Sequence, residues 1–358
     1  MHLPYLRELA DRYDVRALCD LSPTALGAAG DLFPGAARCS DWRELVARPL
    51  DAVFALTPGS HAPIAVAAAE AGRHVFVEKP MCFSVAEGIE MIEAADRADV
   101  RLMVGYMKRY DPAFERVADT LVPAEIRLAR ITTLESPLEP YVDHYPLRRA
   151  DDLPASLAAA LREDDDRRIG AAVGTEDTVL ARAYRVILLD SMVHELNAVR
   201  ALLGEPTDLR FADVWGEPAG LTATLAFGET ECVVMWVDLP GIARYQGELA
   251  FFGANERTTL RFPSPFLRSM PTTVVREGGK PGTAEAFEAV ETVSFEEAFK
   301  RELVEFYAAV SEGREPLTSG RDAIRDVALA EAIARAARDR VSISVPTAYE
   351  ERESRALH

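Results

Sequence analysis

The sequence lacks paired cysteines, long apolar runs and clusters of basic residues. Its four cysteines, Cys19, Cys39, Cys82 and Cys232, lie far apart and form no CxxC pair, which argues against a disulfide framework and against a zinc site. No run approaches the ~20 apolar residues that span a bilayer, so no membrane segment is expected. The formal net charge of -18 disfavours binding to phosphate backbones, and nucleic acid is therefore not an expected partner.

The first residues also lack the features of an export signal. Met1 to Tyr5 have neither a basic start nor a continuous apolar stretch, so we expect a cytoplasmic protein. The chain has 358 residues, of which 49% are hydrophobic and 27% are charged, a balance typical of globular proteins. At this length we expect about two domains.

Strand and helix patterns alternate from the start of the chain. Strands are expected at 15–19, 52–56, 74–77 and 102–104, with helices at 3–13, 63–71 and after Ser84, which forms a capping box with Glu87. Such alternation implies right-handed crossovers and a parallel sheet covered on both faces. We assign residues 1–120 to a Rossmann-like, doubly wound α/β domain that binds a dinucleotide.

The second half changes in character. Segments 126–134, 221–227, 232–237 and 247–252 read as strands without intervening helices. Leu221 to Phe227 alternates apolar and polar residues, as in an antiparallel sheet with one buried face. We assign residues 121–358 to an α+β domain with a large, mainly antiparallel sheet that serves substrate binding and oligomerisation.

Three further segments of this half carry local signals. Residues 141–178 are rich in charge and poor in strand signals, and form either an insertion with a solvated surface or a lid. Ser294 and Glu297 make a second capping box ahead of an amphipathic helix. Residues 341–345 read as a short closing strand.

The tripeptide Glu78-Lys79-Pro80 directly follows a buried strand. Ligands of open α/β sheets bind at the carboxyl ends of the strands, so an ammonium group there is a candidate for handling a substrate proton. Much later, Asp190 and His194 are four residues apart, a spacing that places both on one face of a helix. Histidine exchanges protons near neutral pH, which suits the same chemistry.

These residues together resemble the Gfo/Idh/MocA family of glucose-fructose oxidoreductase and inositol dehydrogenase. The resemblance spans essentially the whole chain and rests on these motifs: Asp20 at a strand end, Leu56-Thr57-Pro58 with Ser60-His61, the run 71–80 ending in Glu78-Lys79-Pro80, Gly105-Tyr106 with Arg109-Tyr110-Asp111-Pro112, and Asp190 with His194. It implies a nicotinamide cofactor and oxidation or reduction of a sugar, an inositol or a related polyol.

The resemblance also implies a role for each matching residue. The resemblance implies a catalytic group of Lys79, Asp190 and His194, and no metal. It implies that the cofactor is held by Asp20, Ser22, Thr57, Pro58, His61, Glu78, Lys79 and Pro80. It implies that the substrate is contacted by Tyr106, Arg109, Tyr141 and Asn197. Asp20 favours NAD over NADP, because a carboxylate accepts hydrogen bonds from an unphosphorylated ribose. A homo-dimer or homo-tetramer formed through the C-terminal sheet is expected.

Two departures from the family pattern are visible. The glycine that often stands two residues before the histidine is replaced by Met192. The first strand and its G-x-G-x-x-G turn are expected before a helix resembling residues 1–13, and the sequence begins inside that helix. A start codon assigned too late, a truncation, and a degenerate paralogue remain as explanations. The alternative to the enzyme is accordingly a non-catalytic sugar-binding or scaffolding protein without dinucleotide binding.

Overall fold

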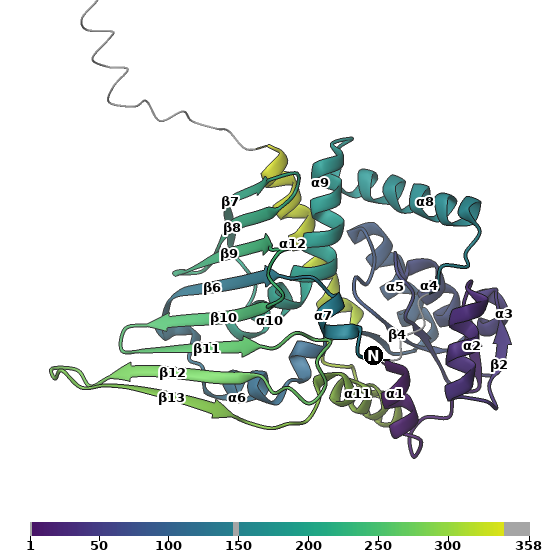
Figure 1. Cartoon of the computed structure of the whole chain (residues 1–358), viewed down its shortest axis with the longest axis horizontal. Coiled ribbons are helices and arrows are strands. Elements are labelled where there is room, and N and C mark those ends of the chain that lie inside the picture. Colours follow the sequence, from purple (N-terminus) through teal and green to yellow (C-terminus); the bar gives the residue numbers. More distant parts are fainter. Residues whose placement is uncertain (1, 146–149, 340–358) are drawn as a thin grey trace, which may run out of the picture.

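A computed structural model describes residues 2–145 and 150–339 of the chain, as two parts that pack side by side (Figure 1). One part holds short parallel strands and their helices, and the other holds a large sheet. None of the described helices is long and apolar enough to cross a membrane.

The first part follows the alternating order expected from the sequence. Its elements are α1 (His2–Glu8), β1 (Ala17–Cys19), α2 (Pro23–Leu32), β2 (Ala37–Cys39), α3 (Trp42–Val46), β3 (Ala52–Ala55), α4 (Ala62–Glu70), β4 (His74–Val77), α5 (Val85–Ala98), β5 (Leu102–Val104), the 3-10 helix η1 (Met107–Tyr110) and α6 (Pro112–Thr120). All strand pairs here are parallel, which confirms the Rossmann-like fold class.

These parallel strands form two separate sheets. β1 pairs with β2, and β3, β4 and β5 pair in that order, but no described strand joins β1 to β3. A doubly wound sheet normally has a strand at that place, between the strands that end here at Asp20 and Thr57. A cavity lies there instead, lined by both β1 and β3. The gap agrees with the expectation that the first strand is missing.

Strand β4 lies at the centre of its sheet and positions the Glu78-Lys79-Pro80 tripeptide. Val75, Phe76 and Val77 are all fully buried, as expected for a strand covered on both faces. The strand is entered through Gly72, whose positive φ of 73° suits glycine after the end of α4. The peptide bond between Lys79 and Pro80 is cis.

The second part is a mixed sheet of eight strands in the order β13-β12-β11-β10-β6-β9-β8-β7. The strands are β6 (Ile126–Glu135), β7 (Asp208–Trp215), β8 (Gly220–Phe227), β9 (Thr230–Asp238), β10 (Gln246–Gly253), β11 (Glu256–Phe262), β12 (Thr273–Gly279) and β13 (Ala286–Thr292). The β6–β9 pair is parallel and the other described pairs are antiparallel. The prediction of a large, mainly antiparallel sheet is therefore confirmed.

Helices cover the face of this sheet that is turned toward the parallel strands (Figure 1). They are α9 (Thr178–Arg182), the π-helix η3 (Ala183–Met192), α10 (Val193–Leu203) and α12 (Gly320–Arg338). Ile187 and Leu188 of η3 pack in one core with Leu221 of β8 and Val234 of β9. Because η3 packs in this core, the core fixes the position of its last turn, which carries Asp190.

The charged segment 141–178 is largely helical. It includes the last two residues of α7 (Glu139–Val142) and all of α8 (Ala155–Val173), while its residues 146–149 lie outside the described part. The acidic run lies on α8 and is tied down: Arg168 donates to Glu87 of α5 at 2.7 Å and to Asp164 at 2.6 Å. A lid function stays a prediction.

One of the two predicted capping boxes is wrong. Helix α11 (Ala298–Glu312) begins after Glu297, which makes no side-chain cap, and Ser294 lies outside the helix. The carboxylate of Glu297 instead accepts from Arg268 and the Ser269 amide, so tertiary contacts outweighed the local motif. Ser84, in contrast, caps α5 by accepting from the Glu87 amide at 3.2 Å. The predicted strand 341–345 lies outside the described residues.

Candidate functional site

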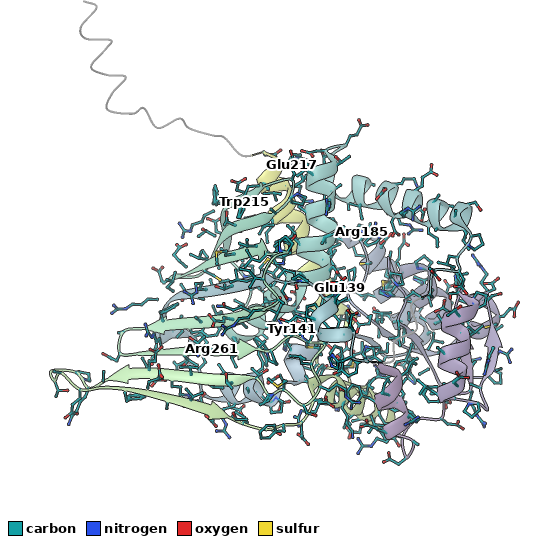
Figure 2. All side chains as sticks on the ribbon, in the orientation of Figure 1. Glu139, Tyr141, Arg185, Trp215, Glu217 and Arg261 are labelled. Atoms are coloured by element: carbon teal, nitrogen blue, oxygen red, sulfur yellow. The ribbon has the colours of Figure 1, made fainter. Side chains whose placement is uncertain are left out.

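The cavity that fills the gap between β1 and β3 continues past the carboxyl ends of the parallel strands to the contact between the two parts, with a total volume of about 1650 Å³. Eight of the residues predicted for the site line it: Asp20, Thr57, Pro58, Glu78, Lys79, Tyr141, Asp190 and His194. They come from both halves of the chain, and Tyr141 reaches the cavity from α7, which lies at the boundary (Figure 2). The fold therefore brings the predicted catalytic residues of both halves to one place.

Lys79 bridges the two parts. It follows β4, and its Nζ donates to the backbone carbonyl of Asp190 at 2.6 Å and to its carboxylate Oδ1 at 2.7 Å. Lys79 is 21% exposed and Asp190 is 64% exposed, so the ion pair borders the open cavity. An ammonium held in this way is available to an oxygen atom bound in the cavity.

Asp190 and His194 lie where two helix types meet. The π-helix η3 ends at Met192 and α10 begins at Val193, so the predicted single α-helical face is interrupted between them. π-Helical turns are rare and recur at functional sites, because they turn side chains and carbonyl groups away from regular helix geometry. Here the carbonyl of Asp190 accepts from Lys79.

The surroundings of His194 keep its imidazole neutral. Burial lowers its pKa well below the usual 6.5, and the nearby charges of Lys79 and Lys108 lower it further. Its Nδ1 is buried and has no hydrogen-bond partner among the described residues, and the ring of Tyr106 packs edge-on at 6.0 Å. A neutral imidazole beside an ammonium is suited to accept a proton from a substrate hydroxyl.

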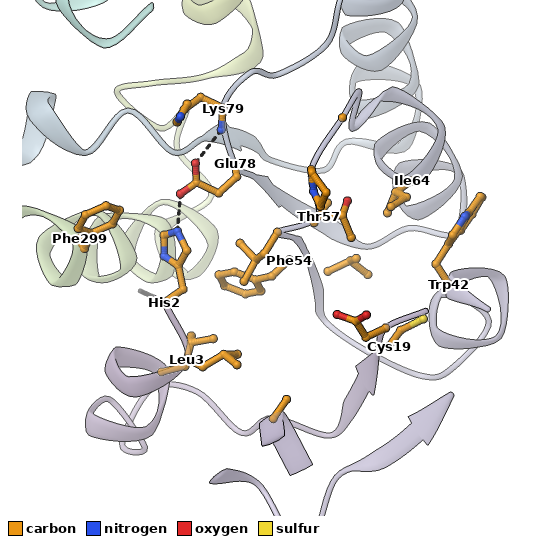
Figure 3. A pocket seen from close by; sticks show the side chains of 18 of the residues that line it. His2, Leu3, Cys19, Trp42, Phe54, Thr57, Ile64, Glu78, Lys79 and Phe299 are labelled. Carbon is orange, nitrogen blue, oxygen red and sulfur yellow. Dashed lines mark hydrogen bonds and ion pairs between the residues drawn. The ribbon is translucent and has the colours of Figure 1, made fainter. Parts of the chain in front are cut away.

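Glu78 organises the backbone below this site (Figure 3). Its carboxylate accepts from the Lys79 amide at 2.9 Å and contacts Nε2 of His2 at 2.6 Å. Burial raises the pKa of Glu78, but the interactions with His2 and Lys79 outweigh it and the pKa is lowered. Close by, Glu302 of α11 is fully buried, and burial with the charge of Glu78 raises its pKa well above the usual value.

His2, Glu78 and Glu302 also form a compact group of possible ligand atoms, which lie within 4.8 Å of one another. Both carboxyl oxygens of Glu302 are without a hydrogen-bond partner among the described residues. Its raised pKa points to a protonated, neutral carboxyl group, which removes the charge that a cation would need.

The predicted cofactor residues divide into two sets. Asp20 is at the end of β1 and its Oδ1 accepts from the Ser22 amide at 2.8 Å, while Ser22 caps α2 and bonds to Asp152. His61 is fully buried, with its ring nitrogens 2.7 Å from the carbonyl oxygens of Thr57 and Pro80. These contacts hold the loops after β3 and β4 together, and explain a histidine at this position without a cofactor.

Three of the four residues predicted to contact the substrate are not among those that line the cavity. Tyr106, Arg109 and Asn197 are buried at the contact between the two parts. Arg109 donates to Asn197 at 3.0 Å, and Asn197 donates to Asp322 and Asp326 of α12 at 2.8 and 2.7 Å. This network accounts for the residue types of Arg109 and Asn197, whereas the buried hydroxyl of Tyr106 has no hydrogen-bond partner among the described residues; contact of all three with a substrate stays a prediction.

Sequence reasoning missed several polar side chains that line the cavity near His194. They are Lys108, Glu135, Ser191, Glu195 and Tyr245. Glu135 stands at the end of a predicted strand, and Glu195 adjoins His194, so both carried a positional signal. Tyr245 carried none, because it lies in an irregular segment ahead of β10.

The parallel strands with crossover helices and the second sheet domain define the class of fold: a two-domain protein with a Rossmann-like half, with a lysine and a histidine near the junction. Residues 1–106 match the model of an oxidoreductase family described as GFO_IDH_MocA, NAD-binding Rossmann fold. Together with the relatives below, this match confirms the resemblance of the sequence to the Gfo/Idh/MocA family of oxidoreductases.

Relatives of known activity match along almost the whole chain. The inositol 2-dehydrogenase of Rhizobium meliloti is 24% identical, with 92% of this chain and 91% of that protein covered. The D-apiose dehydrogenase of Paraburkholderia graminis is 28% identical, with 94% and 84% covered. A solved structure of levoglucosan dehydrogenase with NADH and levoglucosan shares the fold with a TM-score of 0.71 and 18% identity, over 97% of this chain and 96% of that one.

Proposed function

We propose that the chain is a cytoplasmic, NAD-dependent oxidoreductase that transfers hydride between nicotinamide and a hydroxyl or carbonyl group of a sugar, an inositol or a related polyol. The observation that carries this proposal is the meeting of Lys79, Asp190 and His194 in one cavity at the carboxyl ends of parallel strands. The activities named for the inositol and apiose dehydrogenases support the substrate class.

The cavity fits the two ends of a nicotinamide dinucleotide. Asp20 lies after β1, where a carboxylate accepts hydrogen bonds from a ribose and repels a 2′-phosphate, and the exposed Leu21 offers no positive charge beside it. At the other end lie Lys79 and His194. Asp20 and the uncharged Leu21 support NAD rather than NADP.

The residues of the chain supply the proton chemistry. When bound, the nicotinamide exchanges a hydride with the carbon atom of the substrate. During oxidation, the neutral imidazole of His194 accepts the proton of the hydroxyl group, and the ammonium of Lys79 stabilises the negative charge that develops on the oxygen. Asp190 holds that ammonium in place through two acceptors. During reduction the proton moves in the opposite direction.

A second candidate function is a non-catalytic sugar-binding or scaffolding protein. Among the described residues, no strand lies between β1 and β3. The pyrophosphate of a dinucleotide is normally bound at the carboxyl end of a strand in that place. This gap favours the alternative, whereas the paired Lys79 and the neutral His194 favour the enzyme.

Titration with NADH separates the two candidates. The purified chain is expected to change the fluorescence of the nicotinamide in a saturable way, and then to reduce NAD with members of a panel of polyols and sugars. Parallel runs with NADP test the role of Asp20, which is expected to disfavour it. If no saturable binding occurs and no panel member is oxidised, the non-catalytic function is the correct one for this chain.

We propose in addition that the chain forms a homo-dimer or homo-tetramer through the sheet face turned away from the helices. Phe211, Trp215 and Val233 lie on that face by strand register and are 50%, 40% and 40% exposed, an apolar surface that suits a partner sheet. Figure 2 labels Trp215, which comes from β7 at the edge of the sheet. Light scattering is expected to give a multiple of the 39.3 kDa chain mass, and Val233→Lys is expected to reduce it.

A further inference from the structure

A polar cluster beside His194 is not used by the proton chemistry described above. It consists of Lys108 of η1, Glu135 at the end of β6, Ser191 of η3, Glu195 of α10 and Tyr245 ahead of β10. These five side chains come from five elements and line the same cavity as Lys79 and His194. We call them the polar subsite.

Lys108 and Glu195 form a buried ion pair within the polar subsite. They are 4% and 1% exposed, and the Lys108 ammonium lies 4.6 Å from the centre of the Phe262 ring. Removing two charges from water rarely stabilises a fold on balance, so a function is the better explanation for such a pair at a cavity wall. The second carboxylate oxygen of Glu195 is buried and has no hydrogen-bond partner among the described residues.

Glu135 adds further acceptor oxygens. Its Oε2 accepts from Ser191 Oγ at 3.2 Å, and Ser191 itself is fixed by the Trp236 indole, whose N–H donates to its hydroxyl oxygen at 3.0 Å. Burial raises the pKa of Glu135, and the charge of Glu195 acts in the same direction, although Ser191 and Lys108 oppose it. Its carboxylate accepts from Ser191 and from the Ser136 amide, and its oxygens have further lone pairs that a ligand hydroxyl can use.

Tyr245 completes the polar subsite with a hydroxyl group. Burial, followed by the charges of Glu195 and Glu135, raises its pKa well above 10, so its O–H is kept as a donor. Its backbone amide donates to the hydroxyl of Tyr141 at 2.7 Å, which fixes the segment that carries it. The cluster therefore presents several acceptors and one hydroxyl that both donates and accepts.

The positive charges near His194 are already matched by carboxylates. Lys79 is paired with Asp190, and Lys108 is paired with Glu195. Among the described residues Glu135 forms no ion pair, and the Lys108 charge that acts on it is already paired with Glu195. An anionic group bound in the polar subsite would be repelled by the carboxylates, and both nearby lysines are already paired. Sugar hydroxyls, in contrast, would donate to the carboxylate oxygens and accept from the hydroxyl of Tyr245.

We propose that the polar subsite binds the hydroxyl groups of the substrate next to the reacting carbon, and that it selects an uncharged polyhydroxy compound over one carrying a carboxylate or phosphate. This inference rests on the proposed function and specifies its substrate class. Glu135 and Tyr245 are the residues that determine specificity, and the Lys108–Glu195 pair positions them. A site built to bond hydroxyls rejects compounds without them by large factors, because its buried polar groups are then left unpaired.

The test uses matched pairs of compounds, glucose with glucuronate and inositol with inositol phosphate. Initial rates with NAD are measured for the full chain, and binding of each compound is measured by calorimetry without relying on turnover. The neutral member of each pair is expected to be preferred by about 100-fold or more in kcat/KM and to bind more tightly. Equal or better use of the anionic member overturns the proposal.

Variants assign the effect to the polar subsite. Glu135→Gln is expected to raise KM for the neutral compounds about 10-fold with a smaller change in kcat, and Glu135→Lys is expected to improve binding of glucuronate. Tyr245→Phe supplies a second variant of nearly unchanged shape. Glu248→Gln on β10, outside the cavity and paired with Arg130 and Arg261, is the matched control. An unchanged neutral-to-anionic ratio in Glu135→Gln and Glu135→Lys, with folding verified by circular dichroism, contradicts the assignment.

The proposed oxidoreductase activity and the proposed preference for neutral substrates can be disproved separately. If no compound is oxidised with NAD or NADP, the proposed oxidoreductase activity fails, and calorimetry still decides whether the cavity prefers neutral polyols. If oxidation occurs with anionic sugars as the better substrates, the activity stands and the specificity assigned to Glu135 and Tyr245 is wrong.

Discussion

Lys79 donates to two oxygens that belong to the same residue. An ammonium group has three N–H donors, and the carbonyl and carboxylate of Asp190 engage two of them. The third donor is then available to a substrate oxygen in the cavity. On this geometry we expect Asp190 to position the ammonium and Lys79 to contact the substrate.

Replacing Lys79 with methionine is expected to lower kcat for polyol oxidation by about 100-fold or more, because the charge that stabilises the developing alkoxide is lost. Lys79→Arg is expected to restore little, since a planar guanidinium cannot take the same place. The rate of NADH formation is the measurement. Lys300→Met, on the exposed pair with Glu8, controls for loss of a lysine, and an undiminished rate in Lys79→Met would exclude the assigned role.

His194 predicts the pH dependence of the reaction. Its lowered pKa means that the imidazole stays neutral until the pH falls well below 6.5, so kcat/KM for oxidation is expected to stay level at pH 6.5 and to decline only in more acid solution. Lys108→Met removes one of the charges that lower this pKa and is expected to move the acid limb upward. A decline centred at or above pH 6.5 in the unaltered chain would contradict the neutral imidazole.

The proposed catalytic residues and the proposed specificity residues differ in how far the sequence reveals them. Lys79 was found because it follows a buried strand, and Asp190 with His194 because of their spacing. Glu135 and Tyr245 were missed, because they meet through the pairing of β6 with β10, which no local pattern encodes. When strand pairing brings together residues that are far apart in the sequence, their spacing along the chain does not reveal the contact.

At the scale of helices and strands, buried apolar runs were the sequence pattern that predicted strands most accurately. The runs that became β3 and β4 were predicted almost to the residue, whereas β2, only Ala37–Cys39 with a central arginine, gave no such run. β13 was also missed, because its side chains are almost all exposed and lack a buried face. Short and exposed strands depend on their neighbours rather than on their own sequence.

The two predicted capping boxes provide a stability test at this scale. Ser84→Ala removes the side-chain acceptor at the start of α5 and is expected to lower the free energy of unfolding by about 1 kcal/mol. Ser294→Ala is expected to change it by less than ~0.5 kcal/mol, because α11 begins beyond Ser294. Urea unfolding followed by circular dichroism measures both. Equal effects of the two substitutions would show that the cap of α5 contributes nothing specific.

At the scale of the whole molecule, the sequence indicated two domains, and the class of each is confirmed by the parallel and mixed sheets. It did not indicate how they pack. The contact uses Arg109, Asn197 and two aspartates of α12, whose polar side chains carry no hydrophobic period. Because η3 and α12 fix the sheet domain against the strands, Lys79 and Asp190 meet although 111 residues separate them.

The gap between β1 and β3 can be tested by adding a strand that would fill it. His2 begins α1 beside Glu78, at the carboxyl edge of the sheet, so a strand and turn joined in front of His2 would run through the gap parallel to both neighbours. We expect that fusing an apolar strand and a glycine-rich turn in front of His2 raises the melting temperature, because backbone groups of β1 and β3 gain hydrogen-bond partners. We also expect NADH to bind about tenfold more tightly or better, because the turn offers N–H donors to the pyrophosphate. A glycine-serine extension of equal length is the control. Calorimetry and fluorescence titration give both quantities, and identical behaviour of the two extensions would show that the gap does not accept a strand.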